Sequence, residues 1–348
     1  MRLLPALLFA AAASACAPKA ASPGPPRSRL ATATRPADFT GPGGRPLARR
    51  RATILYENRG RAFPLPLVTG TIAGQPALML VDTGANSHII AGWLARKLGL
   101  PMRRLGDSGS DHVGKSVPTF RIENPGVVID RWGALAPAPI LALDVPEVIE
   151  RLGIGAFISP QRLVDAPAKG EDGDAIVLDL EKGEIRAAWW DDARYELTAE
   201  GIELVRGDES SRVCEEQSGP IKVLAYVVPA SIESQRVSLL LDTGAQHSDL
   251  FASSAAGLKL AGQSVTNKEP MYTASGRVST RIVKSARVTA GSFSVTTDVD
   301  LITGGPDAAC PRDGVIAMDV LRSCTLLLGR SRVYGRCAAP SEARAPVR

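Results

Sequence analysis

Two aspartates in matching surroundings are the residues of this 348-residue chain best suited to chemistry. Asp82 lies in "LMLVDTGANSH" and Asp242 lies in "SLLLDTGAQHS", and each ends an apolar run. Burying one ionised carboxylate is costly unless a partner or hydrogen bonds compensate for the lost water. Two carboxyls about 3 Å apart share one proton, so that the ionised member can deprotonate a water while the protonated member hydrogen-bonds a carbonyl. The sequence therefore predicts an acid–base pair.

The residues that follow each aspartate suit a close approach of two loops. Thr83 and Thr243 carry hydroxyls that can hydrogen-bond across the base of the pair and fix both loops. Gly84 and Gly244 have no side chain, so the two backbones can come close and present N–H groups to the carboxylates. These four residues are predicted to support the pair.

The elements around the two motifs repeat in the same order, which indicates a duplicated domain. Each copy reads as strand, turn and strand into the aspartate, then a short helix, a polar Gly/Ser stretch, and an apolar run before another helix start. Turns capped by two unrelated aspartates are the alternative, but they leave the repeated context unexplained. The repeat predicts two similar lobes, 53–197 and 198–337, and the abundant Gly (33) and Pro (26) favour many short strands and turns over long helices.

The paired Asp-Thr-Gly motifs resemble those of the aspartic peptidases. The short Asp-Thr-Gly-Ala form is similar to the retropepsin-like branch, and two lobes in one chain are similar to the pepsin layout. The resemblance covers residues 53–337 and implies an all-β fold of two similar barrel-like acid-protease lobes, with an active-site cleft between them and a few short helices. It implies that Asp82 and Asp242 are the catalytic pair of an endopeptidase that acts on peptides or proteins, as a monomer and without a cofactor. The alternative is a catalytically inactive cell-envelope lipoprotein that binds peptides in this cleft.

The resemblance also implies a hairpin flap from the first lobe that covers the substrate. The polar stretch 106–123 is its expected place, and the candidates for its tip are Ser108, Gly109, Ser110 and Asp111. A second signature of two apolar residues and Gly is expected near the end of each lobe. The nearest matches are Gly153-Ile154-Gly155 and Val315-Ile316-Ala317, and both depart from it. Asp319 follows at an apparent helix start, where an N-cap is expected.

Alanine stands after both Asp-Thr-Gly motifs, at Ala85 and Ala245, where pepsin-like enzymes usually have Ser. A Ser hydroxyl donating to the carboxylate would favour its ionised form and lower the apparent pKa values of the pair. Both donors are absent here, so the resemblance implies a shared proton that persists to higher pH than in a pepsin-like site.

The N-terminus reads as an export signal, residues 1–15, with a basic Arg2, an apolar stretch and a small-residue cleavage site. Cys16 follows at once, and "ASAC" resembles the lipobox of bacterial lipoproteins, which implies a lipid-anchored outer-membrane protein, or otherwise a periplasmic or secreted one. Residues 16–52 are Pro/Gly-rich with eight basic residues and one acidic, which predicts a disordered tether. Residues 338–348 read as a disordered tail. The net charge of +5 therefore comes from the tether, and no nucleic-acid motif is present.

Four cysteines remain if Cys16 carries lipid, and an exported protein is expected to pair them. Three pairings are open, and the favoured one joins Cys214 to Cys337 and Cys310 to Cys324. No His/Cys cluster has metal-ligand spacing, so no metal site is predicted. His88 and His247, just after the motifs, are expected to be loop residues.

Overall fold

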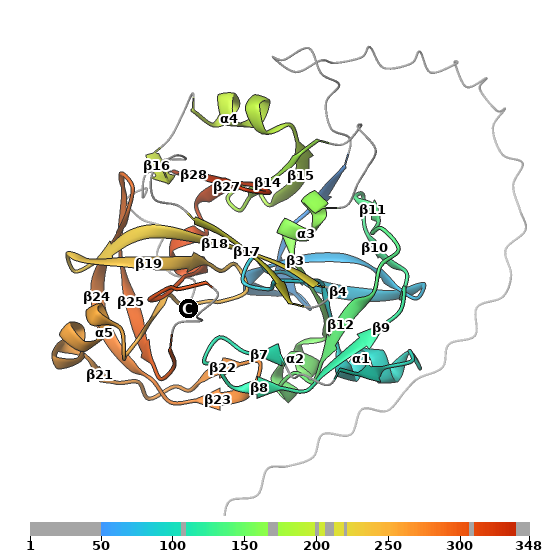
Figure 1. Ribbon diagram of the computed structural model, residues 1–348, viewed down its shortest axis with the longest axis horizontal. Helices are drawn as coiled ribbons and strands as arrows, with labels where there is room; N and C mark the ends of the chain where they lie inside the picture. Colours follow the sequence, from blue (N-terminus) through green and yellow to red (C-terminus); the bar gives the residue numbers. More distant parts are fainter. Residues whose placement is uncertain are drawn as a thin grey trace, which may run out of the picture. The chain divides into compact units, whose positions relative to one another are not determined.

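The computed structural model describes residues 50–105, 109–165, 173–198, 202–205, 212–218, 221–305 and 310–338 (Figure 1). The expected signal peptide, Cys16 and Ser108 lie outside these residues, as do nearly all of the expected tether and tail. Within the described ranges, no helix is long and apolar enough to span a bilayer. All of these described residues belong to one compact unit.

The first lobe is built on a ten-stranded sheet in the order β11-β10-β3-β4-β13-β5-β12-β9-β6, with β2 added beside β3. Two short helices, α1 and α2, lie between its strands. The bounds are β2 Leu55–Asn58, β3 Arg61–Ile72, β4 Gln75–Val81, β5 Ile89–Ala91, α1 Gly92–Lys97, β6 Arg103–Arg104, β9 Thr119–Ile122, β10 Val127–Ile129, β11 Gly133–Ala134, β12 Ile140–Leu143, α2 Glu147–Leu152 and β13 Ile154–Ile158.

The second lobe repeats this plan in an eight-stranded sheet, β17-β18-β19-β26-β20-β25-β24-β21, in which β18 also pairs with β24. In both lobes a parallel pair carries the motif strand: β4 with β13 in the first and β19 with β26 in the second. The bounds are β17 Arg212–Ser218, β18 Ile221–Ile232, β19 Gln235–Leu241, β20 Asp249–Phe251, α5 Ala255–Leu260, η1 Ala261–Gln263, β21 Val265–Thr266, β24 Arg281–Ala290, β25 Phe293–Ile302, β26 Gly314–Ile316 and α6 Met318–Leu321. The all-β fold of two similar acid-protease lobes is confirmed.

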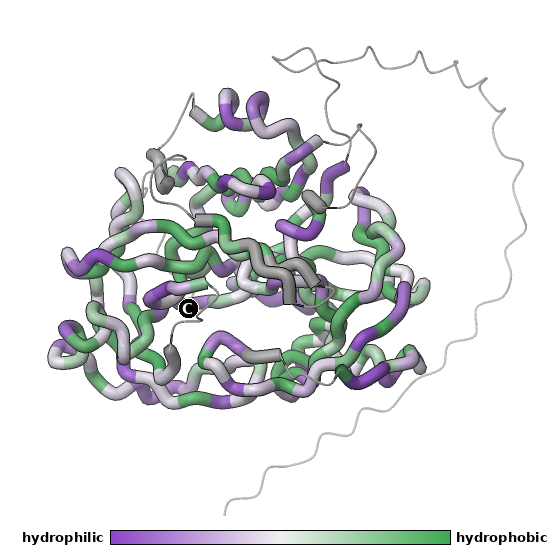
Figure 2. Tube along the Cα trace, in the orientation of Figure 1, coloured by the Kyte–Doolittle hydropathy of each residue, from purple (hydrophilic) through white to green (hydrophobic). Residues whose placement is uncertain are grey.

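The hairpin that leads into each motif turns in the same way in both lobes. Ala73 and Gly74 join β3 to β4 with φ of 49° and 74°, and Glu233 and Ser234 join β18 to β19 with φ of 47° and 65°. Two successive positive φ values suit a two-residue hairpin because they match the right-handed twist of the strands. Figure 2 shows that hydrophobic residues lie along the strands, whereas the turn between β18 and β19 is hydrophilic. The duplication therefore extends to backbone conformation.

A six-stranded sheet joins the two halves of the chain in the order β1-β15-β14-β27-β28-β16. Its central contact is the antiparallel pair β14–β27, so strands from both sides of residue 197 share one sheet. Trp190 is buried against this sheet with Leu327 and Tyr334. β1 includes Arg51 and Ala52, which the sequence assigns to the tether. The bounds are β1 Arg51–Thr53, α3 Pro160–Asp165, β14 Ala175–Asp179, β15 Glu184–Ala188, α4 Trp190–Thr198, β16 Ile202–Val205, β27 Cys324–Gly329 and β28 Val333–Cys337.

The predicted cysteine pairing is wrong: the disulfides join Cys214 to Cys310 and Cys324 to Cys337. The reason lies in strand register. Cys324 and Cys337 face each other across the β27–β28 hairpin with their Cα atoms 3.9 Å apart. Cys214, on β17, instead packs with buried Cys310 in one apolar cluster. Disulfides persist in oxidising compartments, so the two bridges indicate an extracytoplasmic environment.

Candidate active site

The two aspartates occupy equivalent positions just beyond the parallel strand pairs. Asp82 follows β4 and donates its backbone N–H to the carbonyl of Ile158 at 2.8 Å, while Asp242 follows β19 and donates to Ile316 at 3.0 Å. The true first-lobe counterpart of Val315-Ile316-Ala317 is therefore 157–159, Phe-Ile-Ser, and the expected match at 153–155 is wrong. Both lobes thus replace the glycine of the second signature, with Ser in the first and Ala in the second.

The two threonines cross-link the motif loops at their base. The backbone N–H of Thr83 donates to the Thr243 hydroxyl at 3.1 Å, and the reciprocal bond measures 3.0 Å. Each hydroxyl then donates onward, Thr83 to the carbonyl of Leu241 and Thr243 to that of Val81, both at 2.7 Å. Both threonines are fully buried, so this four-bond network fixes one lobe's motif against the other's.

The glycines let each carboxyl lie against the opposite loop. A Cβ atom on Gly84 would stand 2.5 Å from the Asp242 Cγ, and one on Gly244 would stand 2.5 Å from the Asp82 Cγ. No side chain can occupy that space. The structure thus brings Asp82 and Asp242 together across a pseudo-twofold arrangement.

Backbone amides hold the two carboxylates in place. Asp82 Oδ1 accepts from the N–H groups of Gly84 at 2.8 Å and Ala85 at 3.0 Å. Asp242 Oδ1 accepts from Gly244 at 2.8 Å. Burial and the negative charge of Asp242 raise the pKa of Asp82 well above its usual range, and the amides of Ala85 and Gly84 only partly oppose this. Both aspartates remain partly exposed, so the pair can hold one proton and still receive a reactant.

Gln161, which the sequence reasoning missed, supports the first motif from behind. Its side-chain amide is fully buried and donates to the carbonyls of Thr83 at 2.8 Å, Ala85 at 2.9 Å and Leu224 at 3.1 Å. Leu224 lies on β18 of the second lobe, so one side chain ties the first motif to both lobes. The sequence feature that could have indicated Gln161 is its position at the helix start that follows the repeated apolar run.

Asp319 holds the corresponding place in the second lobe, and its expected role as an N-cap is wrong. The N-cap of α6 is Ala317, with no side-chain hydrogen bond. Asp319 instead accepts from the Ser248 hydroxyl at 2.7 Å, the Ser248 N–H at 3.1 Å and the Thr297 hydroxyl at 3.0 Å. Burial raises the pKa of Asp319 against these hydrogen bonds. It positions the loop that follows Asp242.

His88 and Ser248 are another equivalent pair. The N–H of Ser159 donates to His88 Nδ1 at 3.2 Å, and the N–H of Ala317 donates to the Ser248 hydroxyl at 3.0 Å. Burial, with a contribution from Arg162, lowers the pKa of His88 to about 3. The imidazole is therefore a neutral acceptor that holds the loop after Asp82, rather than an acid–base group.

The expected flap region forms a hairpin, although its candidate tip residue Ser108 lies outside the described residues. The strands are β7 Gly109–Ser110 and β8 Ser116–Val117, and only the backbone of Gly109 and Ser110 is described. Asp111 Oδ1 accepts from the N–H of Lys115 at 2.8 Å within the turn. The second lobe forms a matching hairpin from β22 Met271–Thr273 and β23 Gly276–Val278, and Figure 1 shows the two hairpins side by side.

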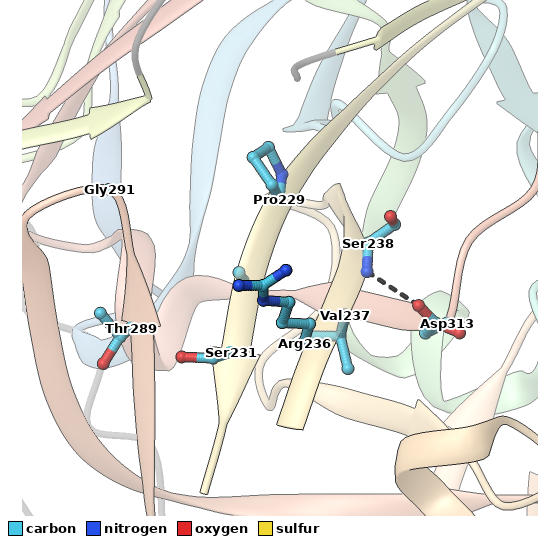
Figure 3. A pocket seen from close by; sticks show the side chains of 9 residues that line it. Pro229, Ser231, Arg236, Val237, Ser238, Thr289, Gly291 and Asp313 are labelled. Atoms are coloured by element: carbon cyan, nitrogen blue, oxygen red, sulfur yellow. Dashed lines mark hydrogen bonds between the residues drawn. The ribbon is translucent and has the colours of Figure 1, made fainter. Parts of the chain in front are cut away.

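A shallow hollow on the second lobe lies away from the aspartates and does not compete with them as a site. Figure 3 shows it between β18, β19 and the end of β24, with Arg236 and Asp313 among its lining residues. Asp313 already accepts from the N–H of Ser238 at 2.8 Å. Among the residues that the structure describes, no group of three His, Cys, Asp or Glu side chains is arranged to hold a metal ion.

Comparisons with known proteins find a matching family model and a similar solved structure. A family model described as aspartyl protease matches residues 68–153 and 228–320, one stretch in each lobe and together about half of the chain. The basic 7S globulin from soybean is a similar solved structure, with 10% identity and a TM-score of 0.47 over 84% of this chain and 96% of that one. No curated protein matches the sequence. Each matched stretch contains one of the two Asp-Thr-Gly motifs, and the chain belongs to the aspartyl protease family.

Proposed function

We propose that the protein is an aspartic endopeptidase in which Asp82 and Asp242 share one proton and activate a water. The observation that carries the proposal is the reciprocal approach of each carboxyl to the glycine of the other lobe. Two carboxyls held this close ionise in sequence, so one is a base while the other is an acid over a range of pH. The raised pKa of Asp82 supports a retained proton.

The reaction follows from this proton. The ionised carboxylate removes a proton from the trapped water as its oxygen attacks the peptide carbonyl, while the protonated carboxyl donates to the carbonyl oxygen. In the tetrahedral intermediate that results, one carboxyl holds the water's proton. As that proton passes to the amide nitrogen, a hydroxyl of the intermediate returns its proton to the other carboxylate, and the C–N bond breaks as the carbonyl forms again. The products are a carboxylic acid and an amine, and the pair is left with one shared proton again.

The test is cleavage of a diverse peptide mixture by the purified exported protein, followed as new termini across pH, with and without a statine-type inhibitor. Asp82→Asn and Asp242→Asn should each abolish cleavage while the fold is kept. Asp191→Asn is the matched control, because Asp191 is exposed on α4. Peptide binding that survives both changes, without cleavage by the wild type, would instead establish the inactive peptide-binding module.

We further propose that the protein is a lipoprotein of the cell envelope, anchored through Cys16. The lipobox-like "ASAC" and the two disulfides support this location. Cys16→Ala should move the protein from the membrane fraction to the soluble fraction after export. A wild-type protein found wholly in the soluble fraction would contradict the anchor and leave a periplasmic or secreted protein.

A further inference from the structure

The first-lobe hairpin, residues 109–117, makes direct contacts with the second lobe. Asp111 Oδ2 accepts from the backbone N–H of Ser275, in the turn of the second-lobe hairpin, at 3.2 Å. Gly304 is close enough to Val113 that a Cβ on this glycine would stand 3.3 Å from the Val113 Cα. We call residues 109–117 the closing hairpin, because it reaches from one lobe to the other.

The strongest of these contacts is an ion pair between His112 and Asp249. His112 Nε2 lies 3.0 Å from each carboxylate oxygen of Asp249, and the imidazole ring packs against Phe251 with centroids 5.2 Å apart. Asp249 is fully buried on β20, whereas the His112 side chain keeps 18% of its surface exposed. A buried carboxylate is costly without a cation, so the carboxylate favours the docked position of the hairpin.

This ion pair lies within electrostatic reach of the catalytic pair. Asp249 lies opposite Val315 on β26, and Val315 lies opposite Leu240 on β19, two residues before Asp242, so the docked histidine lies near the site. The charge of Asp242 accordingly acts on both His112 and Asp249. We propose that His112 is a positioning residue, which through Asp249 holds the closing hairpin docked next to Asp82 and Asp242. This role in cleavage rests on the proposed function, whereas the docking itself does not.

The charges around the pair give the docking a pH window. Burial lowers the pKa of His112, and the charge of Arg312 also lowers it. The charge of Asp249, its hydrogen bond to His112 and the charge of Asp242 together outweigh these two effects, so the pKa of His112 is raised. Burial raises the pKa of Asp249, and the charges of Asp242 and Asp300 raise it further. His112 lowers this pKa but offsets the increase only in part. The pair is therefore fully charged only between these two pKa values, and it weakens at higher pH as His112 loses its proton and at lower pH as Asp249 gains one.

The docked histidine also keeps one unsatisfied group. His112 Nδ1 is buried and has no hydrogen-bond partner among the residues that the structure describes. In the imidazolium form this nitrogen carries a proton, and a buried donor without an acceptor opposes the docked state. This cost keeps the hairpin able to release, as entry of a peptide requires. An acceptor atom on a bound peptide that hydrogen-bonds His112 Nδ1 would remove this cost and favour the docked hairpin.

The first test is a titration of the imidazoles by NMR in the folded protein. The chain has three histidines, so the signals are few, and His112→Gln assigns one of them. The His112 midpoint should lie above the ordinary value of about 6.5 and fall below it in Asp249→Asn. A wild-type midpoint at or below about 6.5 would overturn the ion pair without any variant.

The second test is hydrogen exchange of residues 109–117 at pH 5 to 6 and again above pH 8. His112→Gln should increase opening by roughly tenfold in the acidic range, an ordinary magnitude for the coupling of two linked events, and by much less above pH 8. The exposed His247 supplies the control His247→Gln, which should leave the hairpin unchanged. Equal exchange in wild type and His112→Gln at every pH would refute the docking.

Peptide cleavage then separates the two proposals. His112→Gln should lower kcat/KM by roughly tenfold in acid, and the difference from wild type should shrink as pH passes the His112 midpoint. Normal cleavage by His112→Gln at all pH values, with a loosened hairpin, would overturn the positioning role while the peptidase stands. Absence of cleavage in every protein, with the NMR and exchange results as expected, would refute the peptidase and leave the docking established.

Discussion

Replacing Thr83 by Val tests the network that joins the two motif loops, independently of any activity. Its hydroxyl donates to the carbonyl of Leu241 at 2.7 Å and accepts from the N–H of Thr243 at 3.0 Å. All three residues are fully buried, so Val leaves one carbonyl and one N–H without a partner and out of reach of water. Each such group costs about 1–3 kcal/mol, and the expected loss in the free energy of unfolding is therefore about 2–6 kcal/mol.

Urea denaturation of Thr83→Val and two matched variants measures this loss. Thr83→Ser keeps the hydroxyl and should cost only about 1 kcal/mol for the lost methyl. Thr119→Val removes a hydroxyl of similar burial whose bond, to the carbonyl of Val117 at 3.0 Å, stays within one lobe. If Thr83→Val were no more destabilising than these two, the network would not be what holds the motifs together.

Two further predictions concern stability. Non-reducing peptide mapping should recover Cys214–Cys310 and Cys324–Cys337. Replacing both cysteines of one bridge by Ser should lower the free energy of unfolding, by about 5 kcal/mol for the first bridge and about 3 kcal/mol for the second. The first closes the longer loop, with a sequence separation of 96 against 13. His88 has a pKa of about 3 in the folded protein against about 6.5 in the unfolded chain, so between these values the unfolded chain binds more protons. The free energy of unfolding should therefore fall as pH drops through this window, by up to about 1.4 kcal/mol per pH unit. His88→Asn should remove this slope.

The paired aspartates could be found from the sequence because their signal is local and occurs twice. The motif and its flanking strands repeat around Asp82 and Asp242, and the chemistry of a buried carboxylate requires a partner. The same repetition extends to the hairpin turns at Ala73-Gly74 and Glu233-Ser234, whose residues differ but whose backbone conformations agree. Local pattern was sufficient wherever one segment fixed its own structure.

The second signature failed because a glycine can serve more than one purpose. Gly155, the glycine of the expected match, lies on β13, where a Cβ atom would collide with Leu94 Cδ2, so this glycine makes room for α1. The residue that faces the end of the motif strand comes later in β13, where Ile158 lies opposite Val81. Only the register of the parallel pair β4–β13 distinguishes a glycine that makes room for a helix from one that packs behind an aspartate.

Contacts between distant segments that share no repeated motif left no trace in the sequence. His112 and Asp249 are 137 residues apart and carry no motif. Cysteine parity likewise predicted two bridges but not their partners, because the Cys324–Cys337 bridge depends on the register of β27 and β28. Such pairs are set by how the lobes pack and by strand alignment, which a single sequence does not encode locally.

The pH dependence of cleavage brings the site and the closing hairpin together. Ala85 contributes only its backbone N–H to Asp82, at 3.0 Å, and no hydroxyl. Burial and Asp242 keep the pKa of Asp82 raised, so the pair should hold its single shared proton in mildly acidic solution, with an optimum on the order of pH 4–6.

Ala85→Ser tests this directly, because a hydroxyl donor favours the ionised carboxylate and should move the acidic limb of kcat/KM to lower pH. A hydrogen bond to a charged group stabilises it by about 1.5–3 kcal/mol, so the shift should be about one pH unit or more. The alkaline limb of kcat/KM also depends on His112, because the closing hairpin loosens as His112 loses its proton. His112→Gln should therefore alter the alkaline limb, whereas Ala85→Ser should mainly move the acidic limb. A wild-type optimum near pH 2, or an unmoved acidic limb in a well-folded Ala85→Ser protein, would contradict this account of the pair.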